Sequence, residues 1–283
     1  MRKTLAVLII GIAMCGPLYA QQASNNPNLS DIVSRMENAD LSARQAAFND
    51  LTTRIASEEH SYSQGEPSSD ALRKFFARHP DQADKIKLAL IHLLDTENHP
   101  IIQDKNPSPN ADAEEESEHY SALIDTVASL DDERAIPALI GAMTTGGMAE
   151  RGLLKYGDNA LGPLRDALKN PDALVRATAL GISLTILKKK KDPASHSEVV
   201  SLIHVSLKDS SFVVRGHAVQ EIDCLDDRRD FVPILEQIAK TDPDKMPGKA
   251  LDGGDGDEFY PVRYDARRVL RDIESNKTCN TSR

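Results

Sequence analysis

The sequence contains no tryptophan, and tyrosine and phenylalanine bring its aromatic content to only 4%. Aromatic platforms of the kind that bind sugars or single-stranded bases are therefore scarce. The three cysteines and eight histidines show no spacing typical of a zinc site. Nucleophile elbows, glycine-rich phosphate loops and a Cys/His pair in a catalytic context are also missing. The sequence thus predicts neither an enzyme nor a cofactor-binding protein.

Positive charge is in short supply as well. The 283 residues carry 34 Lys and Arg against 44 Asp and Glu, a formal net charge of −10. A polyanion would have to approach against this mean field, so nucleic acid and anionic lipid are excluded as expected partners.

The amino-terminal sequence MRKTLAVLIIGIAMCGPLYAQQ predicts a signal peptide. Two basic residues precede an apolar run from Leu5 to Met14, which is far shorter than the roughly 20 residues that cross a bilayer. We expect cleavage after Ala20, giving an exported, periplasmic or secreted chain without a transmembrane span. Lipidation at Cys15 is the alternative, although Met14 departs from the small residue expected before a lipidated cysteine.

The downstream half shows one amphipathic helical pattern after another. Apolar residues recur at the spacing of a helix with one buried face, as in the stripe Val214, Ala218, Ile222 and Leu225. No stretch alternates with a period of two for long enough to indicate a sheet. The sequence therefore predicts an all-α protein.

The expected helices are of two alternating kinds. One kind carries a proline near its start, where the missing N–H has no intrahelical acceptor, at Pro137, Pro163 and Pro233. The other kind has the form Val-Arg-x-x-Ala, with its arginine at Arg176, Arg215 and Arg263. The intervals between these arginines are 39 and 48 residues. The first is the length of a two-helix repeat, and the second indicates the same repeat with an insertion.

This pattern resembles the HEAT family of helical repeats, in particular the short bacterial HEAT-like type, over about residues 131–275. The resemblance implies an α-α superhelix, that is, a solenoid of antiparallel helix pairs. It also implies that Arg176, Arg215 and Arg263 reach turn aspartates of neighbouring repeats, with Asp172 and Asp209 as the candidates. These side chains would then form a ladder that holds the repeats in register.

The expected organisation has five parts. They are a signal peptide at 1–20, amino-terminal helical hairpins at 21–97, a proline- and acid-rich linker at 98–116, repeats at 117–275 with a loop inserted at 242–258, and a flexible tail at 276–283.

The inserted loop is the main candidate for chemistry. Its glycine-rich sequence carries four carboxylates, Asp252, Asp255, Asp257 and Glu258, which could bind Ca²⁺ outside the cell. The spacing does not fit an EF-hand, however, since glycines would occupy ligand positions. A solvated acidic loop is the simpler interpretation, and it predicts no metal site.

Cys224 and Cys279 both follow helices of the arginine kind. Such helices run parallel as neighbours in a stacked solenoid, so the two thiols could form a disulfide in an oxidising compartment. Two separate thiols are the alternative.

Together these features predict an exported, non-catalytic scaffold or adaptor of the cell envelope that binds a protein or peptide. Two alternatives remain open. Some HEAT-like proteins resemble lyases that attach tetrapyrrole pigments, which would make the chain an enzyme or an enzyme subunit. The acidic loop would instead make it a calcium-dependent structural or adhesion element.

Overall fold

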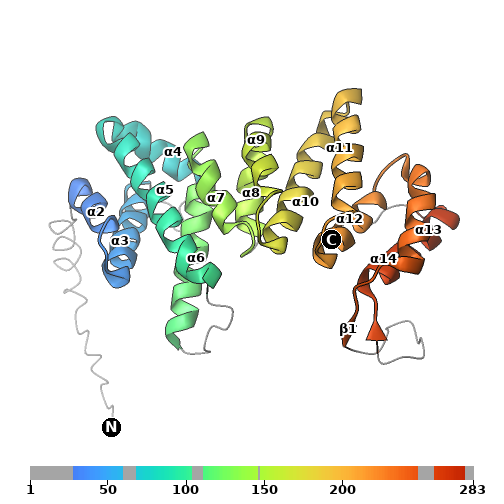
Figure 1. The fold of residues 1–283 in the computed structure, drawn as a ribbon. Helices are drawn as coiled ribbons and strands as arrows, with labels where there is room; N and C mark the ends of the chain where they lie inside the picture. Colours follow the sequence, from blue (N-terminus) through green and yellow to red (C-terminus); the bar gives the residue numbers. More distant parts are fainter. Residues whose placement is uncertain (1–27, 60–67, 104–110, 146, 248–257, 278–283) are drawn as a thin grey trace, which may run out of the picture. The chain divides into compact units, whose positions relative to one another are not determined.

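The computed structural model describes residues 28–59, 68–103, 111–145, 147–247 and 258–277. Figure 1 shows these residues as a succession of helices. The predicted signal peptide, its cleavage site and Cys15 lie outside the described residues. The chain divides into two compact units, residues 1–93 and 94–283.

The first unit is a small helical cluster. Its helices are α2 (Leu29–Met36), α3 (Leu41–Glu59), α4 (Ser69–Arg78) and the first part of α5 (Pro80–Gln103). Helix α3 packs against both α2 and α4, and its fully buried Phe48 and Leu51 belong to the core. The side chains of Asn28 and Ser68 cap α2 and α4, as expected for these residue types at helix N-termini.

The second unit contains nine further α-helices in the described residues. They are α6 (Ala111–Ala128), α7 (Ile136–Ala142), α8 (Gly147–Tyr156), α9 (Asp158–Ala167), α10 (Ala173–Lys190), α11 (Pro193–Ser206), α12 (Phe212–Ile222), α13 (Val232–Thr241) and α14 (Pro261–Glu274). Two short 3₁₀ helices, η1 (Glu133–Ala135) and η2 (Arg228–Phe231), lead into α7 and α13.

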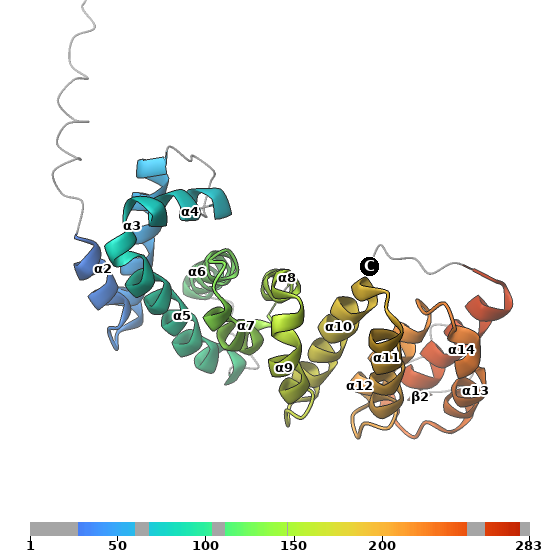
Figure 2. The same ribbon diagram turned by 90° about the horizontal axis from the view of Figure 1, so that it is seen from above.

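These helices are arranged in two layers. Helices α6, α8, α10, α12 and α14 each pack against the next one and form what we call the even layer. Helices α7, α9, α11 and α13 form the odd layer, and each of them pairs with the even helix that follows it. Figures 1 and 2 show the resulting row of helix pairs from two directions. The arrangement confirms the expected all-α solenoid of antiparallel helix pairs.

Apolar side chains between the layers form the core of the stack. Leu164, Leu180, Val219, Leu235 and Val269 come from α9, α10, α12, α13 and α14 and are fully buried. Burying a side chain of this size stabilises the fold by about 1.5–3 kcal/mol. Because each helix pair contacts only its neighbours, the core runs along the stack as a continuous seam.

The linker expected at 98–116 is largely helical, and that prediction was wrong. Helix α5 continues to Gln103 and α6 begins at Ala111, so only residues 104–110 lie outside the described helices. Asn98 explains the continuation, because its side chain is buried and donates to the carbonyl of Ala138 at 2.9 Å. The hydroxyl of Tyr120 in turn donates to Asn98. Tertiary contacts thus stabilise the turn just before Pro100 against the cost of a helical proline.

Of the three prolines expected near helix starts, one lies elsewhere. Pro137 and Pro233 lie in the first two positions of α7 and α13, whereas Pro163 lies inside α9, which already begins at Asp158. Gly157 precedes this helix with a φ of +55°, a conformation that glycine adopts without strain. The glycine therefore starts α9 well before its proline.

The insertion between α13 and α14 contains a short antiparallel pair of strands, β1 (Met246–Pro247) and β2 (Glu258–Phe259). Met246 pairs with Phe259 and Pro247 with Glu258. Residues 248–257, including Asp252, Asp255 and Asp257, lie outside the described residues. None of the helices in the described ranges is long and apolar enough to span a membrane.

Candidate interaction surface

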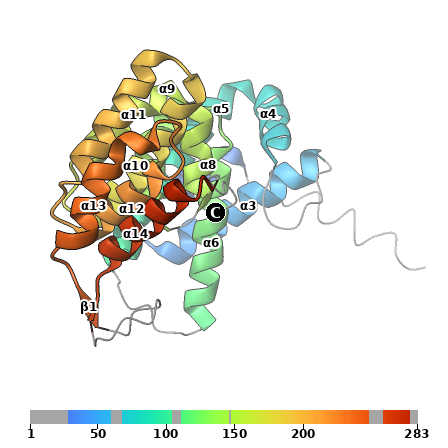
Figure 3. The ribbon, with the colours of Figure 1, turned by 90° about the vertical axis from the view of Figure 1, so that its right-hand side faces the viewer.

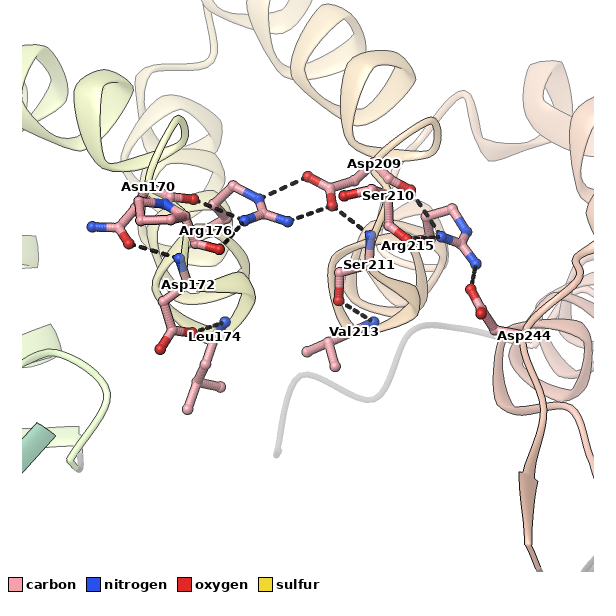
Figure 4. Close-up of polar contacts among 11 residues, drawn as sticks. Asn170, Asp172, Leu174, Arg176, Asp209, Ser210, Ser211, Val213, Arg215 and Asp244 are labelled. Atoms are coloured by element: carbon pink, nitrogen blue, oxygen red, sulfur yellow. Dashed lines mark hydrogen bonds and ion pairs between the residues drawn. The ribbon is translucent and has the colours of Figure 1, made fainter. Parts of the chain in front are cut away.

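Arg176 of α10 joins its own turn to the next repeat. Its Nε and Nη2 donate to the two carboxylate oxygens of Asp209 at 2.9 and 2.7 Å. Its Nη1 donates to the carbonyls of Asn170 and Pro171, six and five residues earlier in the chain. Figure 4 shows this fork between successive even-layer helices. One side chain therefore fixes both the turn before α10 and its distance from the turn before α12.

Arg215 of α12 repeats the arrangement one helix pair later. Its Nη1 donates to the carbonyls of Asp209 and Ser210, again six and five residues back. Its Nε and Nη2 donate to Asp242 at 2.8 and 3.0 Å, and it also pairs with Asp244. The side chains of Arg215 and Asp242 are only 9% and 4% exposed, which makes this the most buried rung.

Arg263 ends the row in a different way. Its Nε donates to the backbone carbonyl of Asp242 at 2.6 Å, and its guanidinium lies 3.9 Å from the ring centre of Tyr260. Asp242 thus accepts from two successive arginines, with its carboxylate from Arg215 and with its carbonyl from Arg263.

The two aspartates named from the sequence have different roles. Asp209 is the partner of Arg176, and it also accepts from the backbone N–H of Ser211 at 2.8 Å. Asp172 caps α10 by accepting from the N–H of Leu174 at 2.7 Å. Sequence reasoning missed Asp242 and Asp244, although Asp242 follows the end of α13 much as Asp209 follows the end of α11.

Hydrogen bonds within the ladder favour the charged forms of Arg176, Arg215 and Asp209. Hydrogen bonds from Arg176 hold the pKa of Asp209 below its ordinary value, and those to Asp209 raise the pKa of Arg176. The bonds to Asp242 likewise raise the pKa of Arg215. The ladder therefore consists of ion pairs with charge-assisted hydrogen bonds, which are stronger than neutral ones.

The first unit contains the same local device. Arg44 in α3 donates through Nη1 to the carbonyls of Asn38 and Ala39, again six and five residues back. Arg44 as a whole is only 8% exposed. The sequence Ser42-Ala43-Arg44 resembles the arginine helices only weakly, yet the backbone contacts are the same.

Side chains of the even layer also meet across neighbouring helices. Lys188 of α10 pairs with Glu221 of α12 at 2.7 Å, and Gln220 of α12 donates to Asp265 of α14 at 3.0 Å. His217 packs over Gly181, where a β-carbon would lie 2.7 Å from its Nε2. These contacts join side chains of neighbouring even-layer helices, while Leu174 of α10 and Val213 of α12 are exposed apolar residues of the same layer.

The remaining sequence candidates lie at the edge of the described residues or beyond it. Glu258 is in β2, while the other three acids of the proposed calcium loop are outside. Within the described ranges, His, Cys, Asp and Glu nowhere form a group of three that could hold a metal ion. Cys224 is disulfide-bonded, but Cys15 and Cys279 are both outside, so the pairing with Cys279 stays a prediction.

No protein-family model matches the sequence, and no curated protein matches it. Among solved structures, designed armadillo repeat proteins are similar to this chain. Designed armadillo repeat protein YIII(Dq)4CqI has 16% identity and a TM-score of 0.36, covering 86% of this chain and 99% of its own. Another, titled as a complex with the peptide (KR)4, has 15% identity and a TM-score of 0.37, covering 87% and 99%. Likeness at these values assigns no ligand to the present chain.

Proposed function

We propose that this chain is an exported, HEAT-like protein-binding module of the cell envelope without catalytic activity. The observation that carries the proposal is the even layer, in which one helix of each successive repeat lies beside the next along one face of the stack. Solenoids of this kind bind proteins and peptides along the extended surface that stacking creates.

The ladder supports the HEAT-like assignment. The Val-Arg-x-x-Ala pattern, the fork of Arg176 on Asp209 and the equivalent fork of Arg215 on Asp242 all join one repeat to the next. Arg176 and Arg215 are held by carboxylates and backbone carbonyls, so these two serve stacking and leave binding to other residues of the surface.

Export rests on the amino-terminal sequence alone. Its test is the amino terminus of the protein isolated from its native host. We expect Gln21 as the first residue, and a lipid-modified Cys15 or an uncleaved Met1 would each contradict cleavage after Ala20.

Affinity capture from the envelope fraction of the native host tests the binding function. Wild-type protein is compared with a variant in which residues 248–257 are replaced by a short turn. This replacement keeps Asp242 and Asp244, which the ladder needs. We expect one protein to be captured reproducibly and to bind the purified chain directly.

The variant then shows where the partner binds. Loss of that partner with unchanged thermal stability would place its site in the insertion, and retention would place it on the helices. If the purified wild type binds no envelope protein, the adaptor function is wrong.

A further inference from the structure

Helix α14 carries three arginines at intervals of four residues, Arg263, Arg267 and Arg271. We call them the arginine stripe. Residues four apart lie on the same side of an α-helix and about 6 Å apart along its axis. Figure 3 shows α13 and α14 at the carboxyl-terminal end of the stack, where no further helix pair follows among the described residues.

Among the residues that the structure describes, the stripe differs from most other arginines because it has no carboxylate partner. Arg263 donates to the carbonyl of Asp242, and Arg267 donates to that of Ala239 at 3.2 Å. The backbone carbonyl of Arg271 accepts from Ser275, but its exposed guanidinium makes no hydrogen bond or ion pair with the residues that the structure describes. By contrast, the neighbouring Arg268 contacts Asp223, Asp265 and Asp272.

Few described acids are free to pair with the stripe. Its two carbonyl contacts lie at the carboxyl-terminal end of α13, beside the exposed Lys240. Two acids close to these residues in the sequence, Asp244 and Asp272, already pair with Arg215 and Arg268. The guanidiniums of the stripe therefore keep their charge without a carboxylate partner among the described residues, in a chain whose net charge is −10.

Aromatic residues adjoin the amino-terminal end of the stripe. Arg263 stacks on Tyr260, and the rings of Phe259 and Tyr264 lie 5.7 Å apart. Arginine and tyrosine are enriched at the energetic centres of protein interfaces. The stacking also restricts the Arg263 side chain, so less conformational entropy is lost when a partner binds.

We infer that the arginine stripe is the docking surface for an extended acidic segment of a partner protein with carboxylates at alternate residues. Alternate side chains of an extended chain point to the same side and lie about 6.6 Å apart, close to the spacing of the stripe. Arginine suits this partner because its planar guanidinium binds carboxylates through two donors. The inference rests on the proposed binding function and specifies its partner.

The test is fluorescence anisotropy with a labelled peptide of alternating aspartate and threonine, whose β-branched residues favour an extended chain. The control peptide has the same composition, with all its aspartates at one end. We expect the wild-type chain to bind the alternating peptide more tightly, and to bind it less tightly as salt is raised from about 20 to 150 mM.

Arg267→Gln with Arg271→Gln should weaken this binding about tenfold. Arg271→Gln alone should weaken it severalfold without changing the melting temperature, because its guanidinium makes no hydrogen bond or ion pair with the described residues. The matched control is Arg151→Gln with Lys155→Gln. It removes two exposed cations, also four residues apart, from α8, and should leave binding unchanged.

Equal weakening by both double variants, or equal binding of both peptides, would show general electrostatic attraction and overturn the inference. Binding of inorganic polyphosphate without binding of the alternating peptide would make the stripe a phosphate-polymer site instead. The experiments distinguish a failure of this inference from a failure of the proposed binding function. If the wild type and the Arg267→Gln/Arg271→Gln variant both capture the same envelope partner, the adaptor function is upheld and its site lies outside the stripe.

Discussion

At the scale of single residues, the ladder arginines act in two directions. Arg176 and Arg215 each hold the turn behind them through two backbone carbonyls and the turn of the next repeat through a carboxylate. A partly buried ion pair of this kind is destabilising to break, because the remaining charge loses its partner while staying away from water.

The burial of each arginine–aspartate pair predicts how much the pair contributes to the free energy of unfolding. Asp242→Asn should lower the free energy of unfolding by about 3 kcal/mol, because Arg215 and Asp242 are almost completely buried. Asp209→Asn should lower it by about 1.5 kcal/mol, since the pair with Arg176 is more exposed. Urea unfolding of the purified variants measures both values.

Asp166→Asn is the control for this pair. Its carboxylate is 81% exposed and, among the described residues, pairs with Lys169 alone, so the change should stay within about 0.5 kcal/mol. A larger effect of Asp209→Asn than of Asp242→Asn would contradict the role of burial.

The lowered pKa of Asp209 also predicts a pH dependence. A carboxyl whose pKa is lower in the folded chain contributes stability above its unfolded value, and this contribution is lost as pH falls through the folded pKa. Below about pH 4 the wild type should therefore lose stability more steeply than Asp209→Asn. Urea unfolding at pH 5 and pH 3 tests this, and parallel losses in the two proteins would contradict it.

Residue identities predicted only part of the ladder. The resemblance to HEAT repeats implied that Arg176 reaches a turn aspartate of a neighbouring repeat, and Asp209 is that aspartate. The bonds to the carbonyls of Asn170 and Pro171 could not be anticipated, because any residue supplies a carbonyl and only the backbone conformation determines where it points. For the same reason, the sequence did not predict the hydrogen bond from Arg263 to the carbonyl of Asp242.

At the scale of elements, close packing depends on particular glycines. Gly152 of α8 is buried, and a β-carbon there would lie 2.8 Å from the β-carbon of Ala128 and 3.3 Å from its Cα. Helices α6 and α8 can approach this closely only because the position lacks a side chain. At Gly162 of α9, a β-carbon would have no atom of another helix within 4 Å, so this glycine is not needed for close packing between helices.

The two glycines should respond differently to alanine. Gly152→Ala should destabilise the fold by about 1–3 kcal/mol through overpacking, because the clash outweighs the higher helix propensity of alanine. Gly162→Ala gains that propensity but places a β-carbon beside the ring of Pro163, which opposes the gain, so the net change should stay within about 1 kcal/mol. Melting temperatures compare the two, and a loss at Gly162 as large as the loss at Gly152 would contradict the explanation from packing.

The carboxyl-terminal residues after α14 are held beside the chain that follows α12. Arg228 donates to the carbonyls of both Asp223 and Lys277, at 3.1 and 2.6 Å. Arg229 donates to the side chain of Asn276 at 2.6 Å. Asp223 directly precedes Cys224, and Lys277 lies two residues before Cys279 in the sequence.

These contacts support a disulfide between Cys224 and Cys279. Peptide mapping by mass spectrometry without reduction should find the two cysteines linked. Cys224→Ser should lower stability by up to about 4 kcal/mol, and adding reductant to the wild type should have the same effect. A link from Cys224 to Cys15, or a free thiol at Cys279, would contradict this pairing.

Helix boundaries were harder to predict than the helices themselves. Apolar periodicity and the prolines indicated α7, α12, α13 and α14, but the acids and prolines of 98–116 suggested a linker where two helices continue. Burial of Asn98 decided the outcome. A tertiary contact of this kind involves Ala138, 40 residues away, and local sequence gives no sign of it.

At the scale of the whole molecule, a stack of repeats should lose stability locally. Because each helix pair contacts its neighbours only, loss of one arginine–aspartate pair should reduce local stability over about one repeat on either side. Asp242→Asn should therefore increase hydrogen exchange in α12, α13 and α14 while leaving α2 and α3 unchanged. Exchange followed by mass spectrometry measures this, helix by helix.

Phe48→Ala provides the reciprocal variant. Phe48 is buried in the core of the first unit, so its loss should increase exchange in α2 and α3 and leave α12, α13 and α14 unchanged. A uniform increase along the chain in either variant would show a single cooperative structure, contrary to the two compact units.

The order of contacts around Arg215 determines where this chain can be lengthened. The arginine reaches back to residues 209 and 210 and forward to Asp242 and Asp244, while the nine additional residues of the last interval come afterwards, before α14. A foreign segment grafted between Pro247 and Glu258 would therefore leave every ladder contact intact. The corresponding graft between Asp209 and Arg215 would separate an arginine from its own turn, so protein engineers should use only the first position.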